Sequence, residues 1–308
     1  MALERLKRII KNPRRIFAGL LYRTAKIWPD KLYLQLLYYF EMGHKLNLKN
    51  PKTFTEKLQW LKLYNRKPEY TTMVDKYAVK EYVAKKIGNE YIIPTLGVWD
   101  TIEDIDWNSL PDQFVLKTTH GGGGGGVVIC RDKVTFNRQA ASQKLRYSLN
   151  SDIYLNYREW PYKNVPKRII AEKFMMESGI QKADSDLADY KFYCFNGEPT
   201  YCQVIRDRRT KETIDFYDME WNHMPFVGLN PKVSNGVLPV VKPKHLDKMI
   251  DICRKLSKDI PFARVDLYVI NEAIYFGEIT FFPASGIGKF EPKGWDKKLG
   301  HLINLPLQ

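Results

Sequence analysis

The sequence of 308 residues is poor in the residues that mark disulfide-bonded and zinc-binding proteins. It has four cysteines, none of them in a Cys-x-x-Cys pair, and its five histidines are scattered. A disulfide framework and a structural zinc site are therefore not predicted. No stretch approaches the roughly 18 consecutive apolar residues of a membrane-spanning helix, and the basic N-terminal segment lacks the apolar core of a signal peptide. We expect a soluble cytoplasmic protein, peripheral at most to the inner face of the membrane.

Acidic residues are in deficit as well, and this predicts polyanionic partners. The chain has 35 Asp and Glu against 49 Lys and Arg, a net charge of +14. Residues 1–31 carry nine Lys or Arg and two acids, which is half of that excess. This basic, amphipathic segment predicts either peripheral contact with an anionic membrane or an ordinary helix packed on the rest of the chain. No known RNA or DNA motif is present, so no nucleic-acid partner is expected.

The hydrophobic pattern predicts an α+β fold with two lobes. Helical spacing dominates the first 70 residues, where Thr53 and Glu56 have the spacing of a capping box. Helices and short β-branched runs alternate after that point. Asn196-Gly197 and Asn271-Glu272 separate paired runs and predict two hairpins. The expected regions are a basic helical region (1–70), a first lobe with a glycine-rich flap (71–167) and a second lobe with a hinge strand and an acidic hairpin (168–308).

Six consecutive glycines in "KTTHGGGGGGVVIC" (117–130) interrupt two apolar runs. A P-loop needs its lysine after the glycines and then a helix, whereas here Lys117 precedes the glycines and a β-like run follows them. The dinucleotide-binding glycine motif also requires a helix at that place. The pattern predicts a flap between two strands, whose bare N–H groups can approach nucleotide phosphates beside Lys117. A loose surface loop is the alternative.

Charged residues alternate along the C-terminal hairpin "RVDLYVINEAIYFGEIT". Arg264 and Asp266 share one face of a strand, and Glu278 and Thr280 share a face of its partner. The turn between the strands can bring both pairs side by side. Two carboxylates and a hydroxyl form an all-oxygen site that suits Mg²⁺ bridging phosphates, with Arg264 beside it to neutralise charge on a transferred phosphoryl group. A routine cross-strand ion pair is the alternative.

Seven stretches in order resemble the TupA-like branch of the ATP-grasp superfamily. They run from about residue 50 to 300, and they are "NPKTFTEKLQWLKLY", "VDKYAVKEYV", "LPDQFVLKTTHGGGG", "REWPYKN", "RIIAEKFM", "DYKFYCFNGEP" and "FARVDLYVINEAIYFGEIT". The resemblance implies an ATP-grasp fold, in which two α+β lobes clasp ATP. The first fifty residues lie outside it.

The resemblance also implies roles for individual residues. Expected contacts to ATP come from Lys76, Lys117, His120, Gly121, Gly122, Gly123, Gly124, Gly125, Gly126, Glu172, Lys173, Phe174, Asp189 and Lys191. Asp266, Glu278 and Thr280 fall on the positions that hold Mg²⁺, although Thr280 stands where the family usually has Asn. Arg264 and Lys117 fall on catalytic positions, and Arg264 would contact an acyl phosphate. His120 is read equally well as a structural turn residue.

By the same resemblance, the chain is expected to be a carboxylate–amine ligase that forms an amide through an acyl phosphate and releases ADP. Its substrates would be a uronic acid of a bacterial surface polysaccharide such as a capsule, or an acidic glycan, together with an amino acid or amine. An aromatic and cationic cluster between the lobes suits such a sugar, and a packed connector is the alternative. The cluster consists of Arg158, Trp160, Tyr162 and Lys163, along with Tyr157.

Three other functions remain open on the sequence alone. A glycosyltransferase of a capsule or O-antigen pathway would need an Asp-x-Asp motif, for which only "DSD" (184–186) is available, without a preceding apolar strand. A sugar kinase could use the same ATP-binding lobes. A non-catalytic basic protein that binds nucleic acid or membrane would leave the acidic hairpin unexplained.

Overall fold

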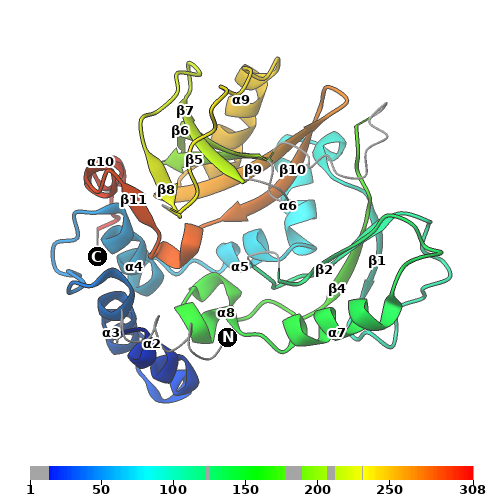
Figure 1. Cartoon of the computed structure of the whole chain (residues 1–308), viewed down its shortest axis with the longest axis horizontal. Coiled ribbons are helices and arrows are strands. Elements are labelled where there is room, and N and C mark those ends of the chain that lie inside the picture. The colour runs from blue at the N-terminus through cyan, green and yellow to red at the C-terminus, as the bar shows by residue number, and fades with distance from the viewer. Residues whose placement is uncertain (1–13, 123–124, 178–188, 207–211, 231, 308) are drawn as a thin grey trace.

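Two antiparallel β-sheets face each other across the middle of the chain (Figure 1). This is a computed structural model, and it describes residues 14–122, 125–177, 189–206, 212–230 and 232–307. The expected helix near residues 3–10, the glycines Gly123 and Gly124 and the "DSD" triplet lie outside these ranges. The α+β class expected from the hydrophobic pattern is confirmed.

The first sheet has four strands in the order β1-β4-β2-β3. The strands are β1 (Thr95–Trp99), β2 (Phe114–Thr118), β3 (Val127–Cys130) and β4 (Ile169–Lys173). Helix α7 (Arg138–Leu149) packs against β2 and β3, and its Leu145 is buried with Phe114 and Leu116 of β2. Strands β2 and β3 pair directly, Lys117 opposite Val127, which confirms that the glycine run joins two paired strands.

The second sheet has five strands in the order β10-β9-β5-β6-β7. They are β5 (Asp189–Phe195), β6 (Glu198–Arg206), β7 (Thr213–Asp218), β9 (Phe262–Ile270) and β10 (Ala273–Thr280), and α9 (Leu246–Ser257) packs on β5, β6 and β9. A small sheet pairs β8 (Val227–Leu229) with β11 (Lys289–Glu291), and α10 (Gly294–Leu302) follows it. The hydrophobic pattern gave no prediction for β7, β8, β11 or α10.

Both predicted hairpin turns are confirmed. Asn196 and Gly197 join β5 to β6 with φ values of 50° and 87°. Asn271 and Glu272 join β9 to β10 with φ values of 50° and 64°. Two consecutive positive φ values are characteristic of the tight turn that matches strand twist, and Asn and Gly adopt that conformation at the lowest cost.

Short helices make up most of the N-terminal third of the chain, and two more lie between β3 and β4. They are α2 (Arg14–Arg23), η1 (Ala25–Ile27), α3 (Asp30–Met42), α4 (Phe54–Tyr64), α5 (Glu69–Val74), α6 (Ala78–Ile87) and η2 (Asn89–Tyr91); α8 (Ile153–Tyr157) and η3 (Trp160–Tyr162) come later. Thr53 and Glu56 form the predicted capping box of α4. None of the helices within the described ranges is both long and apolar enough to cross a bilayer.

The sheets correct the expected boundaries of the lobes. Strand β4 pairs with both β1 and β2, so a boundary at residue 167 would cut through the first sheet. The expected boundary at residue 70 would assign α4 to the N-terminal region and α6 to the first lobe. Their buried side chains, among them Leu58 and Val83, instead join the apolar core of the second sheet. Hydrogen bonding within the sheet and burial of these helix faces therefore set the extent of each lobe.

Candidate functional site

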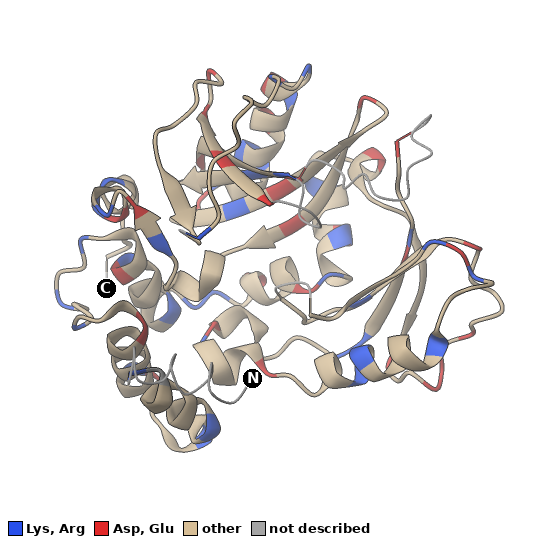
Figure 2. Ribbon diagram, viewed as in Figure 1, with Lys and Arg blue, Asp and Glu red and all other residues tan. Residues whose placement is uncertain are grey.

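A cavity of about 940 Å³ opens between the two sheets. It is lined by residues from β2, β4, β5, β9 and β10 and from the segments around α6 and η3. Sixteen of the residues predicted from the sequence line it: Lys76, Lys117, Gly121, Gly122, Gly126, Tyr157, Tyr162, Glu172, Lys173, Phe174, Asp189, Lys191, Arg264, Asp266, Glu278 and Thr280. In Figure 2, acidic positions on β9 and β10 lie across from a basic position on α6. Segments nearly 200 residues apart therefore meet in one place.

The hairpin of β9 and β10 brings the predicted acidic pair together. Glu278 lies opposite Asp266, and Thr280 lies opposite Arg264. Arg264 donates from Nε to Asp266 Oδ1 at 2.7 Å, and from Nη2 to Glu278 Oε1 at 2.8 Å and Thr280 Oγ1 at 3.1 Å. Thr280 in turn donates to Glu278 Oε1 at 3.2 Å. The predicted arrangement of the two pairs side by side is confirmed.

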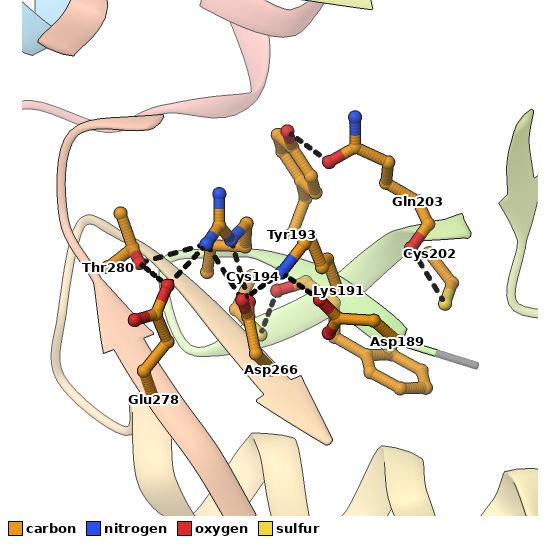
Figure 3. Close-up of polar contacts among 11 residues, drawn as sticks. Asp189, Lys191, Tyr193, Cys194, Cys202, Gln203, Asp266, Glu278 and Thr280 are labelled. Carbon is orange, nitrogen blue, oxygen red and sulfur yellow. Dashed lines mark hydrogen bonds and ion pairs between the residues drawn. The ribbon is translucent and has the colours of Figure 1, made fainter. Parts of the chain in front are cut away.

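Strand β5 adds a second cation to this cluster. Lys191 lies opposite Asp266 in the sheet, donates to its Oδ2 and pairs with Asp189 at 2.7 Å. Figure 3 shows the polar ends of Asp189, Lys191 and Asp266 pointing toward one another, with Glu278 and Thr280 on the neighbouring strand. Charges of opposite sign thus alternate across three adjacent strands, which makes their burial tolerable.

The pKa values of Asp266 and Glu278 shift in opposite directions. Burial raises the pKa of Asp266, and the neighbouring Arg264 and Lys191 only partly oppose that rise. Burial also acts to raise the pKa of Glu278, but the positive charges of Lys76 and Arg264 outweigh it and lower the value to about 2. Glu278 therefore stays ionised at any physiological pH.

The donor set fits a small divalent cation that takes its other ligands from elsewhere. Among the described residues, no group of three or more His, Cys, Asp or Glu could hold a metal by itself. Asp266 and Glu278 nevertheless face one cavity, and the Glu278 side chain is 41% exposed. Mg²⁺ commonly binds one or two carboxylates and completes its shell with phosphate oxygens and water. Two carboxylates and the Thr280 hydroxyl meet that requirement.

Glu172 lines the cavity away from the acidic hairpin and forms ion pairs with two lysines. Its carboxylate pairs with Lys117 of β2 at 2.6 Å and with Lys80 of α6 at 2.5 Å. Burial raises its pKa, but the two lysine charges outweigh burial and lower it. The backbone N–H of Lys173 is already bonded to the Pro94 carbonyl at 3.0 Å. An adenine ring in this region would therefore need other backbone groups, such as those around Phe174.

Lys76 connects the helical segment to the glycine run. Its backbone N–H donates to the Thr119 carbonyl at 3.0 Å, and its Nζ donates to the Gly121 carbonyl. Burial lowers the pKa of Lys76, and the Glu278 carboxylate opposes that shift. The side chain therefore lies between the flap and the acidic hairpin.

The four glycines of the run that the structure describes differ in how closely their surroundings pack. A Cβ at Gly121 or Gly126 would overlap with Thr118, and at Gly126 also with Ser148. A Cβ at Gly125 would meet nothing within 4 Å. The ends of the run are therefore glycine because the loop packs tightly against β2 and α7, while Gly125 has room for a side chain and does not line the cavity.

Several predicted contacts are corrected. His120 does not line the cavity; its ring is buried and its Nε2 lies 3.2 Å from the Ser148 carbonyl, which supports the structural alternative. Arg158 is also buried, because it pairs with Asp30 at 2.9 Å and stacks over the Tyr33 ring. Trp160 and Lys163 lie outside the cavity lining as well. Of the five residues in the proposed sugar-binding cluster, Tyr157 and Tyr162 line the cavity.

Lys80, Glu159 and Ser285 are among the cavity-lining residues that were not predicted. Lys80 follows Lys76 by one helical turn, so its spacing in the sequence could have indicated it. Glu159 and Ser285 come from a connector and from the segment after β10, and no sequence signal joins them. Only the tertiary fold brings them to the same end of the cavity.

The chain matches a known protein family over most of its length. A family model described as TupA-like ATPgrasp matches residues 56–304, most of the chain. No curated protein is significantly similar to it.

Solved structures match at low identity. One is a D-alanine–D-alanine ligase from Bacillus anthracis complexed with ATP, at 13% identity and a TM-score of 0.38, covering 68% of this chain and 54% of that one. Another is the ATP-grasp ligase PsnB complexed with a minimal precursor, at 10% identity and a TM-score of 0.39, covering 74% and 60%. A third is a D-alanine–D-alanine ligase from Helicobacter pylori, at 16% identity and a TM-score of 0.40, covering 82% and 70%. The match thus spans little more than half the length of the first two.

Proposed function

This chain belongs to the TupA-like ATP-grasp family, and on that premise we propose that it is an ATP-dependent carboxylate–amine ligase that releases ADP. One observation carries the proposal. Lys76 and Lys117 line the same cavity as the carboxylates of Asp266 and Glu278, and such a combination of charges suits a bound nucleotide and its divalent cation.

The nucleotide would lie along the length of the cavity. Its adenine would occupy the end near Glu172 and Phe174, and its phosphates would run toward Lys76 under Gly121 and Gly122. Lysines bind phosphate as point charges, and glycine N–H groups reach phosphate oxygens because no Cβ intervenes. Asp266, Glu278 and Thr280 would hold Mg²⁺, which supplies charge neutralisation between the phosphates when it is bound.

The residues of this chain would act mainly by positioning and by electrostatics. A carboxylate oxygen of the acid attacks the γ-phosphorus, and the bond from phosphorus to the bridging oxygen of ADP breaks. Arg264 lies among the acidic groups, so its guanidinium can stabilise charge on the transferred phosphoryl group. The amine then attacks the acyl carbon and inorganic phosphate leaves. No side chain needs to form a covalent intermediate in this scheme.

For the acid we propose a uronic acid of a bacterial surface polysaccharide, free or within an acidic glycan, and for the nucleophile an amino acid or amine. One support is the resemblance to the TupA-like branch. The others are the cationic side chains and the rings of Tyr157 and Tyr162 that line the cavity. Aromatic faces suit sugar rings and cations suit their carboxylates.

Trapping the acyl phosphate with hydroxylamine tests this function. With Mg-ATP and glucuronate or galacturonate, we expect acid-dependent release of ADP and formation of an acyl hydroxamate in equal amounts. ADP can be measured with a coupled assay and the hydroxamate by mass spectrometry.

The rival functions give different products in the same assay. A sugar kinase would release ADP but leave a stable phosphoester and no hydroxamate. A glycosyltransferase or a non-catalytic protein would consume no ATP. Either pattern would contradict the ligase proposal.

We also propose that the N-terminal helices contact an anionic membrane from the cytoplasmic side. Ile16, Phe17 and Leu20 of α2 and Ile27 of η1 are exposed, although large apolar side chains are usually covered. Exposed basic residues flank them at Arg14, Arg23, Lys26 and Lys31. An apolar stripe between cations fits the interface of a bilayer that contains acidic lipids. Residues 1–13, which hold four further basic positions, lie outside the described ranges.

Removing two of these apolar side chains should release the protein from vesicles. We expect the double variant Phe17→Ser and Leu20→Ser to lower partitioning onto phosphatidylglycerol vesicles about tenfold or more, because each buried side chain contributes roughly 1.5–3 kcal/mol. Sedimentation with the vesicles measures this. The matched control changes Val237 and Leu238, which are exposed elsewhere in the chain, to Ser. Equal partitioning of the wild type and both double variants would remove the membrane proposal.

A further inference from the structure

A buried carboxylate, Glu159, lines the cavity and has no role in the chemistry proposed above. It lies between α8 and η3, and its side chain accepts a hydrogen bond from Ser285 Oγ at 2.7 Å. Ser285 follows the strand that carries Glu278 and Thr280 and lines the same cavity. The connector and the acidic hairpin therefore meet at this hydrogen bond.

The turn that carries Ser285 has a strained backbone. Ala284 and Ser285 have φ values of 46° and 53°, in the left-handed region that side chains disfavour. Residues held in this region are energetically unfavourable and cluster at ligand-binding sites. The surrounding structure enforces the conformation from the far side of the turn. Gln59 donates to the Gly286 carbonyl at 2.8 Å, and Lys62 donates to the Ser285 carbonyl at 2.8 Å.

The charge of Lys62 favours a buried Glu159 carboxylate, although Lys62 donates no hydrogen bond to it. The ammonium group of Lys62 is fully buried, and it donates to Gln59 Oε1, the Tyr157 carbonyl and the Ser285 carbonyl. These three bonds use its three donors. Its positive charge opposes the rise that burial causes in the pKa of Glu159. Among the described residues no hydrogen bond reaches Glu159 Oε2, so this oxygen remains available to the cavity.

Tyr162 lies near Glu159 and near the groups of the acidic hairpin. Its backbone N–H donates to the Glu159 carbonyl at 3.1 Å. Burial raises the pKa of its phenol, and the charges of Glu159, Glu278 and Arg264 all act on it as well. The phenol is therefore close to both acids and to the arginine. Glu159 therefore offers a further negative group in the same cavity, beside the place where the acyl carbon would form.

We propose that Glu159, together with Ser285, binds the nucleophilic substrate as a primary ammonium ion and accepts its proton. This inference rests on the proposed ligase function. One proton moves from the ammonium nitrogen to Glu159 Oε2, and the freed nitrogen lone pair forms a bond to the acyl carbon. The bond from that carbon to the phosphate oxygen breaks, the electron pair leaves with phosphate, and phosphate takes the second proton from nitrogen. The nucleophile is therefore a cationic amine, such as an amino acid.

The test separates neutral from cationic nucleophiles. Hydroxylamine is mainly uncharged at neutral pH and needs no ammonium site, whereas ammonium chloride, methylamine and amino acids arrive as cations. We expect Glu159→Gln to form the hydroxamate at the wild-type rate but to lose about 10²-fold or more in kcat/KM for the cationic amines, as expected for loss of a general base. The matched control is Glu56→Gln, a buried carboxylate on neighbouring α4 that lies outside the cavity lining and whose capping role glutamine can keep.

Each outcome distinguishes this inference from the ligase proposal. If the wild type forms no hydroxamate, the ligase function itself fails. If it forms the hydroxamate but uses none of the cationic amines, or if Glu159→Gln uses them as well as the wild type does, the ammonium site is overturned. Loss of both activities in Glu159→Gln also overturns it, because the carboxylate would then serve the fold or the first step. Hydroxamate formation at the normal rate with selective loss of the amines supports it.

Discussion

Changing Asp266 to Asn is expected to reduce acid-dependent ADP release by about 10²–10³-fold, as when one charge-stabilising group is removed from an active site. Asn keeps the shape of the side chain but loses the negative charge that would bind the divalent cation. Arg264 keeps its bond to Glu278, and Lys191 keeps its bond to Asp189. The neighbouring cations therefore retain partners and the sheet should remain folded. Initial rates of ADP release at saturating Mg-ATP measure the effect.

Asp215 provides a control of similar burial in the same sheet. Its side chain is 1% exposed, as is that of Asp266, and it pairs with Arg206 and His223 at 3.0 Å. It lies on β7, at the other edge of the sheet from β10, and does not line the cavity. We expect Asp215→Asn to lower stability by an amount similar to Asp266→Asn without affecting ADP release. A similar loss of activity in both variants would mean that the effect comes from the fold rather than from the cation site.

Changing Lys117 to Met should weaken ATP binding about 10–10²-fold, since a hydrogen bond to a charged group contributes roughly 1.5–3 kcal/mol. The effect is expected in the KM for ATP. Glu172 still pairs with Lys80 in this variant, so no buried carboxylate is left without a cation. Steady-state kinetics at varied ATP, with the acid saturating, give the value directly.

Lys133 is the matched control for Lys117. It lies in the same lobe, donates to the carbonyls of Asn108 and Leu110, and does not line the cavity. Lys133→Met should leave the KM for ATP unchanged. If Lys117→Met also binds ATP normally, the phosphates do not lie where we propose, and the assignment of Lys76 loses its support as well.

The elements that could be predicted from the sequence are those whose signals are local. The Asn-Gly and Asn-Glu turns fix two hairpins, and the period-two pattern then fixes which side chains share a face. For this reason the sequence alone predicts that Arg264, Asp266, Glu278 and Thr280 lie close together. The two strands on either side of the glycine run were predictable for the same reason.

The errors came from residues whose surroundings are set by distant parts of the chain. Arg158 looks like a free cation among aromatic residues, but Asp30 and the Tyr33 ring, more than 120 positions away, bury it. The contact between Glu159 and Ser285 spans 126 positions and has no periodic signal at all. The boundary at residue 167 was wrong because β4 is hydrogen bonded to strands that precede it in the chain.

A crystal structure with a non-hydrolysable ATP analogue and Mn²⁺ tests the central claim most directly. We predict the triphosphate within hydrogen-bonding distance of Lys76 and Lys117, and an anomalous manganese peak between the phosphates and the carboxylates of Asp266 and Glu278. A nucleotide bound outside the space between the two sheets, or a manganese peak away from the β9–β10 hairpin, would contradict the account.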